Sequence, residues 1–207
     1  NVFKNALVIL ITYRAYQLGA ISPKQMVALC GGIFILPFFL FSALAGQIAD
    51  KYSKSRLVVW IKFAEIMIMI FGSAGFLLGQ IELLLITLFL MGLQSSFFGP
   101  VKYSILPQLI RDDELVQGNA YVEMGTFLSI LLGTILGGVL IAIPQSGATL
   151  VSGTVILLAI SGWATSRSVQ HLDPASASLK IKWNPITTTF EMLKIAKKTR
   201  SVFLSIL

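Results

Sequence analysis

The sequence predicts an all-α fold, a bundle of helices that crosses a lipid bilayer several times. Of the 207 residues, 56% are hydrophobic and 12% are charged, whereas a soluble domain carries about 25% charged residues. Three stretches contain no charge at all, namely 25–49, 83–101 and 124–166, and about 20 apolar residues are enough for one helical span. A buried soluble helical protein is disfavoured, because such helices would show no polar face to water.

Six spans are predicted, and we expect all of them to be helices because lipid cannot satisfy an open sheet edge. The first is expected to be truncated, since the chain starts within an apolar run. The fourth carries Pro100 near its end, and Pro144 to Gly147 separates the fifth from the sixth. The predicted spans are 2–13, 26–47, 57–79, 81–106, 115–143 and 148–165.

Three segments follow from this division: a six-span bundle over 1–166, a cytoplasmic loop over 167–200, and the start of a seventh span over 201–207. We therefore expect the chain to be cut at both ends. Cys30 is the only cysteine and His171 the only histidine, so no disulfide, metal site or cofactor is expected. No catalytic residue is predicted.

The orientation follows from the lysines and arginines between the spans. Thirteen of the 16 lie in the loops after spans two, four and six or just inside span three, and only Arg14 and Lys24 lie on the opposite side. Cytoplasmic loops carry such an excess. The net charge of +7 is thus explained by topology, and no nucleic-acid partner is needed.

The long loop contains a segment typical of an amphipathic helix. Asn184 and Pro185 form a favourable N-cap and first turn. Ile186, Phe190 and Leu193 then lie on one face, flanked by lysines. The pattern favours a helix lying on the cytoplasmic membrane surface, and a solvated linker is the alternative.

The loop between spans two and three carries a more specific pattern. It resembles the signature loop of the major facilitator superfamily, Gly-x-x-x-Asp-Arg/Lys-x-Gly-Arg-Lys/Arg, although serines replace the second glycine and the last cation. The resemblance implies the N-terminal six-helix half of such a transporter, with a loop that latches its two halves in one access state. The matching residues are Gly46, Asp50, Lys51 and Lys54, followed by Arg56.

A second resemblance extends over nearly the whole chain. It is carried by a Pro-x-Lys-Tyr-x-Ile-Leu block, by an Asn and a Glu early in span five, and by Asn and Lys in span one. These features are similar to the lysophospholipid transporter family of the same superfamily, some members of which are fused to an acyltransferase and an acyl-carrier-protein ligase. The matching residues are Pro100, Lys102, Tyr103, Asn119, Glu123, Asn1, Lys4 and Asn5.

Small residues recur every four positions along span five. Gly125, Ser129, Gly133 and Gly137 form one smooth stripe, which favours close packing against another helix. Glycine-rich versions of this helix in antiporters often contain a Gly-Pro pair. Span five has no proline before Pro144, which argues against a proton-coupled drug exporter.

Charged residues within the spans are candidates for the substrate site. A charge at membrane depth is costly and usually faces a cavity or a partner. Lys4, Glu65 and Glu123 are such residues; Lys4, with Asn1 and Asn5, would face the lysolipid phosphate and Glu123 an ethanolamine ammonium. Two structural alternatives remain at this point, an i,i+3 pair of Glu65 with Lys62 and a direct pair of Lys4 with Glu123.

The favoured function is transport of lysophospholipids across the bacterial inner membrane for re-acylation. The partners implied are the lysophospholipid, the membrane lipids and the C-terminal half of the transporter. An exporter of drugs or siderophores with the same fold is the main alternative. A membrane-embedded acyltransferase is poorly supported. Those enzymes use a His and an Asp spaced four residues apart, whereas His171 is followed directly by Leu172-Asp173-Pro174. A structural scaffold would not need charges inside its spans.

Overall fold

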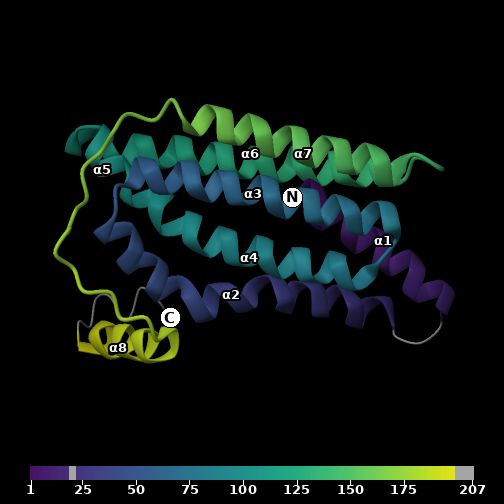
Figure 1. The fold of residues 1–207 in the computed structure, drawn as a ribbon, viewed down its shortest axis with the longest axis horizontal. Coiled ribbons are helices and arrows are strands. Elements are labelled where there is room, and N and C mark those ends of the chain that lie inside the picture. The colour runs from purple at the N-terminus through teal and green to yellow at the C-terminus, as the bar shows by residue number, and fades with distance from the viewer. Residues whose placement is uncertain (19–21, 199–207) are drawn as a thin grey trace.

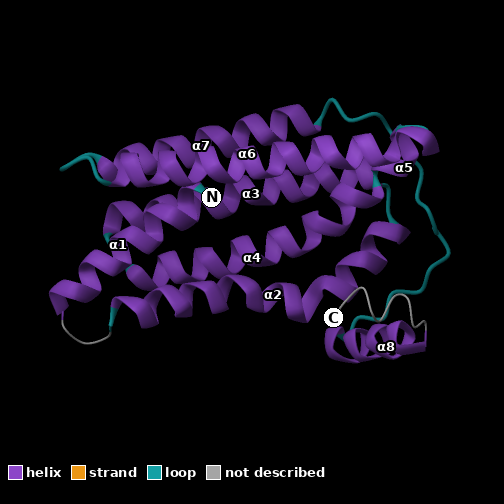
Figure 2. Ribbon diagram, turned by 180° about the vertical axis from the view of Figure 1, so that it is seen from behind, coloured by secondary structure: helices purple, strands orange, loops and turns teal. Residues whose placement is uncertain are grey.

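The computed structural model describes residues 1–18 and 22–198, and all regular elements in these ranges are helical (Figures 1 and 2). The predicted all-α class is therefore confirmed. The expected start of a seventh span, 201–207, lies outside the described residues. In chain order the elements are α1 (Val2–Leu18), α2 (Pro23–Lys51), α3 (Lys54–Leu78), α4 (Ile81–Ser104), α5 (Leu106–Leu109), a 3₁₀ turn (Asp112–Glu114), α6 (Leu115–Ile141), α7 (Gly147–Ser166) and α8 (Pro185–Lys198).

Within the described part, α2, α3, α4, α6 and α7 are long and apolar enough to cross a membrane, and α1 carries the shorter apolar stretch Val2–Tyr13. Local sequence explains where several of these helices begin and end. Ser22 and Gln25 form a capping box before α2, which satisfies backbone N–H groups of the first turn. Gly79 ends α3 in the left-handed conformation with φ 66°, which glycine adopts without steric cost.

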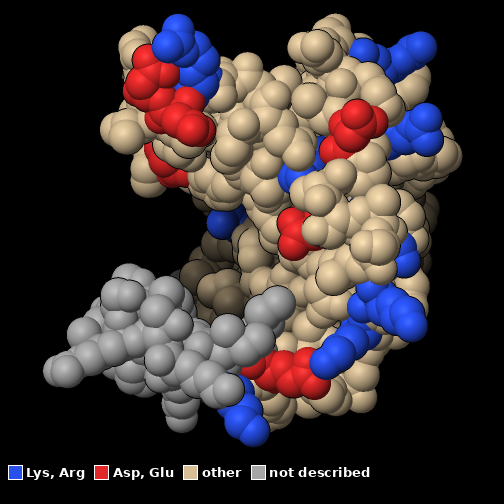
Figure 3. Space-filling model, turned by 90° about the vertical axis from the view of Figure 1, so that its left-hand side faces the viewer, with Lys and Arg blue, Asp and Glu red and all other residues tan. Residues whose placement is uncertain are grey.

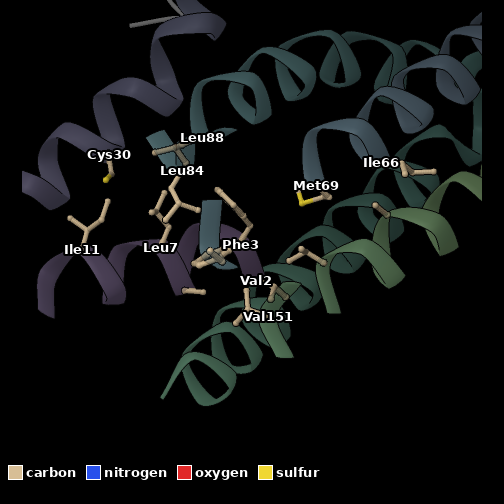
Figure 4. Packing of buried hydrophobic residues seen from close by; sticks show 14 residues of the cluster. Val2, Phe3, Leu7, Ile11, Cys30, Ile66, Met69, Leu84, Leu88 and Val151 are labelled. Carbon is tan, nitrogen blue, oxygen red and sulfur yellow. The ribbon is translucent and has the colours of Figure 1, made fainter. Parts of the chain in front are cut away.

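The six long helices run side by side (Figure 1), and their mutual contacts close a ring in the order α1, α2, α4, α3, α7 and α6. The core lies where α1 meets its neighbours (Figure 4). Phe3, Leu7 and Ile11 project from one face of α1 and are almost fully buried, and the Phe3 ring meets Phe76 of α3 edge-on at 5.3 Å. Cys30 lies buried in the same cluster.

The glycine stripe of span five divides into two parts. A Cβ atom on Gly137 would lie 2.5 Å from the Val2 carbonyl oxygen, and one on Gly133 would lie 3.1 Å from Asn1. Both positions therefore let α6 and α1 approach backbone to backbone. Nothing lies within 4 Å of such an atom on Gly125, and Ser129 is exposed. Among the described residues, only the C-terminal half of the stripe, Gly133 and Gly137, packs against another helix.

This difference predicts opposite effects of one substitution at two positions. Gly137→Ala should destabilise the bundle by about 1–3 kcal/mol, because a methyl group must displace the α1 backbone. Gly125→Ala should leave stability unchanged or raise it slightly, since alanine favours helices in open positions. Thermal unfolding of both variants in detergent checks the pair. Equal melting temperatures would contradict the close α1–α6 packing.

The long loop returns across the ends of α2 and α3 and leads to α8 (Figure 1). The Asn184 side chain accepts from the N–H groups of Ile186 and Thr187 at 3.1 and 3.2 Å, so the predicted cap and helix are present. α8 packs beside α2. Ile186 and Phe190 stay exposed, as does Trp183, while the side chain of Leu193 lies outside the described part. An apolar face is thus available, and its position on the membrane surface stays a prediction.

The orientation in the membrane is likewise a prediction, and the structure sharpens its test. Figure 3 shows the end of the molecule that carries α5 and α8. Basic and acidic side chains lie around the edge of this end, and one side of it is hollowed. Ser53 is buried in the α2–α3 turn and is a poor labelling position. Ser178 and Ser146 are exposed at opposite ends. We expect an impermeant thiol reagent to label Ser146→Cys in intact cells and Ser178→Cys after permeabilisation alone; the reverse result would invert the topology.

Candidate functional site

A polar cluster joins the ends of α4 and α6 that lie nearest the connecting turn. The Lys102 ammonium donates to the Thr126 hydroxyl at 3.0 Å and lies 4.5 Å from the centre of the Tyr103 ring. The Tyr103 hydroxyl donates to the Glu123 carboxylate. One cation, one carboxylate and two hydroxyl groups therefore come from two facing helices, and we call Lys102, Tyr103, Glu123 and Thr126 the α4–α6 cluster.

The cluster is partly open. Lys102, Glu123 and Thr126 are half-buried, and 43% of Tyr103 is exposed. The Thr126 hydroxyl donates to its own helix at the Val122 carbonyl, at 2.7 Å, and so accepts from Lys102. The ammonium keeps two further N–H donors. This arrangement has the capacity to bind an anionic group at Lys102 and a cationic group at Glu123.

Asn119 does not join the cluster, although the sequence placed it in the same motif. Its amide donates to the Leu115 carbonyl of the preceding turn at 2.9 Å. Thr126 was not singled out from the sequence, because a threonine in an apolar helix most often bonds its own backbone. Its partnership with Lys102 depends on where the bundle places the ends of α4 and α6, which no local pattern reports.

The residues of α1 lie apart from this cluster. Lys4 is half-buried with its ammonium 4.9 Å from the centre of the Phe34 ring of α2. Asn5 donates to the Thr134 carbonyl of α6 at 2.7 Å, and Asn1 lies beside Gly133. The two asparagines therefore contribute to the α1–α6 contact, whereas Lys4 faces α2.

These contacts correct the expectation that one head group binds between Lys4 and Glu123. Asn5 lies level with Thr134, and Glu123 lies eleven residues earlier on α6. At 1.5 Å per residue the two levels are about 16 Å apart, too far for the phosphate and ammonium of one lysolipid. The rival direct ion pair between Lys4 and Glu123 is also absent among the described residues.

A second polar group lies between α3 and α4. The Lys62 ammonium is 2.8 Å from the Glu65 carboxylate, and Gln94 donates to the same carboxylate oxygen at 3.3 Å. Lys62 also lies 4.6 Å from the centre of the Phe98 ring. The i,i+3 pair considered from the sequence is confirmed. Glu65 is engaged by two neighbours, which favours a structural role over direct substrate binding.

The α2–α3 turn carries the residues that match the signature loop of the superfamily, and the long loop between α7 and α8 is hydrogen-bonded to it. The Leu172 N–H donates to the Ser55 hydroxyl at 3.2 Å, and the Ser176 N–H donates to the Asp50 carbonyl at 2.8 Å. Ser55 stands where the signature loop usually has a cation, and a cationic side chain has no acceptor for that N–H. The sequence departure thus creates an anchor for the loop.

The charged residues that match the signature loop differ in burial and in contacts. Lys54 is buried, Lys51 lies near the Tyr52 ring, and Arg56 is exposed. Asp50 lies in the last turn of α2 with an exposed side chain. Gly46 makes no close helix contact with the described residues, since nothing lies within 4 Å of a Cβ placed there.

Comparison with known proteins identifies the family. The sequence model of the family described as Major Facilitator Superfamily matches residues 2–207. The chain belongs to the major facilitator superfamily. It is therefore a multi-pass membrane protein of a transporter family, as its helices and their hydropathy indicate.

Relatives within this superfamily carry a more specific name. The lysophospholipid transporters LplT of Salmonella heidelberg (strain SL476), Salmonella agona (strain SL483) and Salmonella typhi are each 35% identical to the chain over 108 residues. The match covers 52% of this chain and 26% of each relative. The matched part of the chain therefore corresponds to about a quarter of the length of each relative. No solved structure matches the chain.

Within a major facilitator transporter, the position of Asp50 predicts a kinetic role. A carboxylate at the C-terminal end of a helix is unfavourable, and no ion pair is formed by Asp50 in the described part. We expect Asp50→Asn to slow transport several-fold and to leave the Kd for substrate unchanged, because the residue acts on the balance of access states. Transport and equilibrium binding by the full-length variant check this; equal losses in both would refute it.

Proposed function

We propose that the chain is the N-terminal half of a transporter that moves lysophospholipids across the bacterial inner membrane to the cytoplasmic leaflet, where they are re-acylated. The observation that carries the proposal is the α4–α6 cluster. It places a lysine and a glutamate on facing helices, which suits the phosphate and the ammonium of a zwitterionic head group. The names of the relatives support the same substrate class.

In this proposal Lys102 binds the lysolipid phosphate and Glu123 binds an ethanolamine ammonium. Tyr103 holds the Glu123 carboxylate in place by its hydrogen bond, and the Lys102 ammonium binds through the two donors that it does not give to Thr126. Lys4 lies about 16 Å beyond the cluster, as derived from the helix rise, and would act on a different part of the transport path. Glu65 serves the bundle, and Asn1 and Asn5 position α1.

An apolar path continues from the cluster along α6. Phe127, Leu131 and Ile135 follow Glu123 at intervals of four residues, and each is more than half exposed. Residues four apart lie on one face of a helix, so the stripe extends about 18 Å from Glu123. A single acyl chain fits such a surface. The other wall of the path would come from the C-terminal half of the transporter.

Binding of single-chain and double-chain lipids to the purified full-length transporter tests this proposal. We expect lysophosphatidylethanolamine to bind at least tenfold tighter than phosphatidylethanolamine with the same acyl chain. Lysolipid binding should weaken in Lys102→Ala. It should persist in Lys24→Ala, which removes an exposed lysine in the first turn of α2, far from the α4–α6 cluster. Equal affinity for the two lipids, or equal binding by the two variants, would contradict the assignment.

A further inference from the structure

Three hollows meet at Trp60 on the outward face of α3. The first, of about 340 Å³, lies between the α2–α3 turn and the long loop and is lined by Tyr52, Arg56 and His171. The second, of about 240 Å³, shares Arg56 and His171 with it. The third, of about 300 Å³, is an apolar groove between α3 and α4. Trp60 borders all three and is 68% exposed.

The end of this surface nearest the turn is suited to an anion. Arg56 is exposed, and its guanidinium forms no ion pair or hydrogen bond within the described part. His171 lines the same two hollows and lies 3.9 Å from Asp173, whose carboxylate is 96% exposed to water. Tyr52 adds a hydroxyl. A free guanidinium beside an imidazole and a phenol is a favourable set of donors for a phosphate group.

The other end of the surface is apolar and runs along α3. Arg56, Trp60, Ala64 and Ile68 recur every four residues on one face of α3. They span about 18 Å, close to the ~15 Å of hydrocarbon in one leaflet. The opposite wall comes from α4, with Leu90, Leu93 and Phe97. This face points away from Ile66 and Met69, which α3 buries in the core.

We propose that this surface is a binding site for an intact phospholipid of the leaflet beside the α2–α3 turn, the cytoplasmic leaflet in the predicted orientation. The phosphate binds at Arg56 and His171, and one acyl chain lies in the α3–α4 groove beneath Trp60. A lipid fits better than a soluble anion, because the polar hollow continues into an apolar groove. Tryptophan at this depth is typical of the membrane interface, and basic pockets there bind lipid head groups. The inference does not depend on which substrate is transported.

Native mass spectrometry of the delipidated full-length transporter tests the site, with dioleoyl phosphatidylglycerol as the probe. Arg56→Gln removes the head-group contact, and Ala64→Phe fills the groove. Each is expected to weaken binding of one lipid molecule at least fivefold. The matched controls are Arg111→Gln, an exposed arginine on another loop, and Ala164→Phe, an exposed alanine on α7. Neither control should change lipid binding.

Each other result would overturn the proposal. Displacement of the lipid by millimolar inorganic phosphate would identify a soluble-anion site. Unchanged lipid binding in Arg56→Gln and Ala64→Phe would show that this surface holds no lipid. If Ala64→Phe also lowered the melting temperature without added lipid, whereas Ala164→Phe did not, the groove would be covered by another part of the full-length chain.

Discussion

Replacing Lys102 with alanine is expected to lower lysolipid uptake by the full-length transporter at least tenfold. The ammonium is the cation of the α4–α6 cluster, and a hydrogen bond to a charged group contributes about 1.5–3 kcal/mol, which is roughly a tenfold to hundredfold change in affinity. Glu123→Gln should affect head groups selectively. It should reduce uptake of lysophosphatidylethanolamine and spare lysophosphatidylglycerol, whose head has no cation.

Two controls separate head-group binding from damage to the helix contact. Thr126→Val removes the hydroxyl that accepts from Lys102 but leaves the ammonium, so uptake should be largely retained. Arg111→Ala removes a nearby exposed cation that pairs with Asp113 and should have no effect. If Thr126→Val reduced uptake as strongly as Lys102→Ala, the cluster would be a structural contact between α4 and α6.

The second large effect is expected at the ion pair between Lys62 and Glu65. Both side chains lie on α3 and are about one-fifth exposed, at 22% and 21%, in a helix long and apolar enough to span the membrane. Glu65→Ala would leave the Lys62 ammonium without its carboxylate, and breaking a buried pair costs about 3–5 kcal/mol. Because solvent screens partly exposed charges, we expect a smaller cost of about 2–3 kcal/mol. Thermal unfolding in detergent should show a clear decrease in melting temperature.

Removing both charges should restore stability. The double variant Lys62→Met, Glu65→Leu keeps similar volume and leaves no unpaired charge, so its melting temperature should return close to that of the unchanged protein. Glu82→Ala, at an exposed position in the first turn of α4, serves as a control and should have a small effect. A stable double variant that no longer transports lysolipid would show that the pair acts in transport, against the structural role given to it here.

Periodicity and hydropathy predicted the helices well, and they missed mainly the helix ends. The third span was expected to begin at Leu57, whereas α3 begins at Lys54, because polar residues continue a helix beyond the hydrocarbon. The second span was expected to end at Gln47, and α2 continues to Lys51. Asn184 marked the start of α8 correctly, since caps depend on local backbone geometry.

The site was harder to predict, because it depends on contacts between helices distant in sequence. Glu123 was visible as a charge within an apolar span and Lys102 as part of the family block, but their association depends on where the bundle places the ends of α4 and α6. The pairing of Lys4 with Glu123 failed for a related reason. Hydropathy gives the depth of a residue along its own helix, and the relative height of α1 and α6 is set by the packing of Gly133 and Gly137.

Uptake of lysophosphatidylethanolamine by inner-membrane vesicles that contain the full-length transporter tests the central claim most directly. The account predicts uptake that depends on the protein, is lost in Lys102→Ala and is retained in Thr126→Val. Vesicles that extrude a cationic drug or a siderophore but take up no lysolipid would contradict it and would favour an exporter of the same fold.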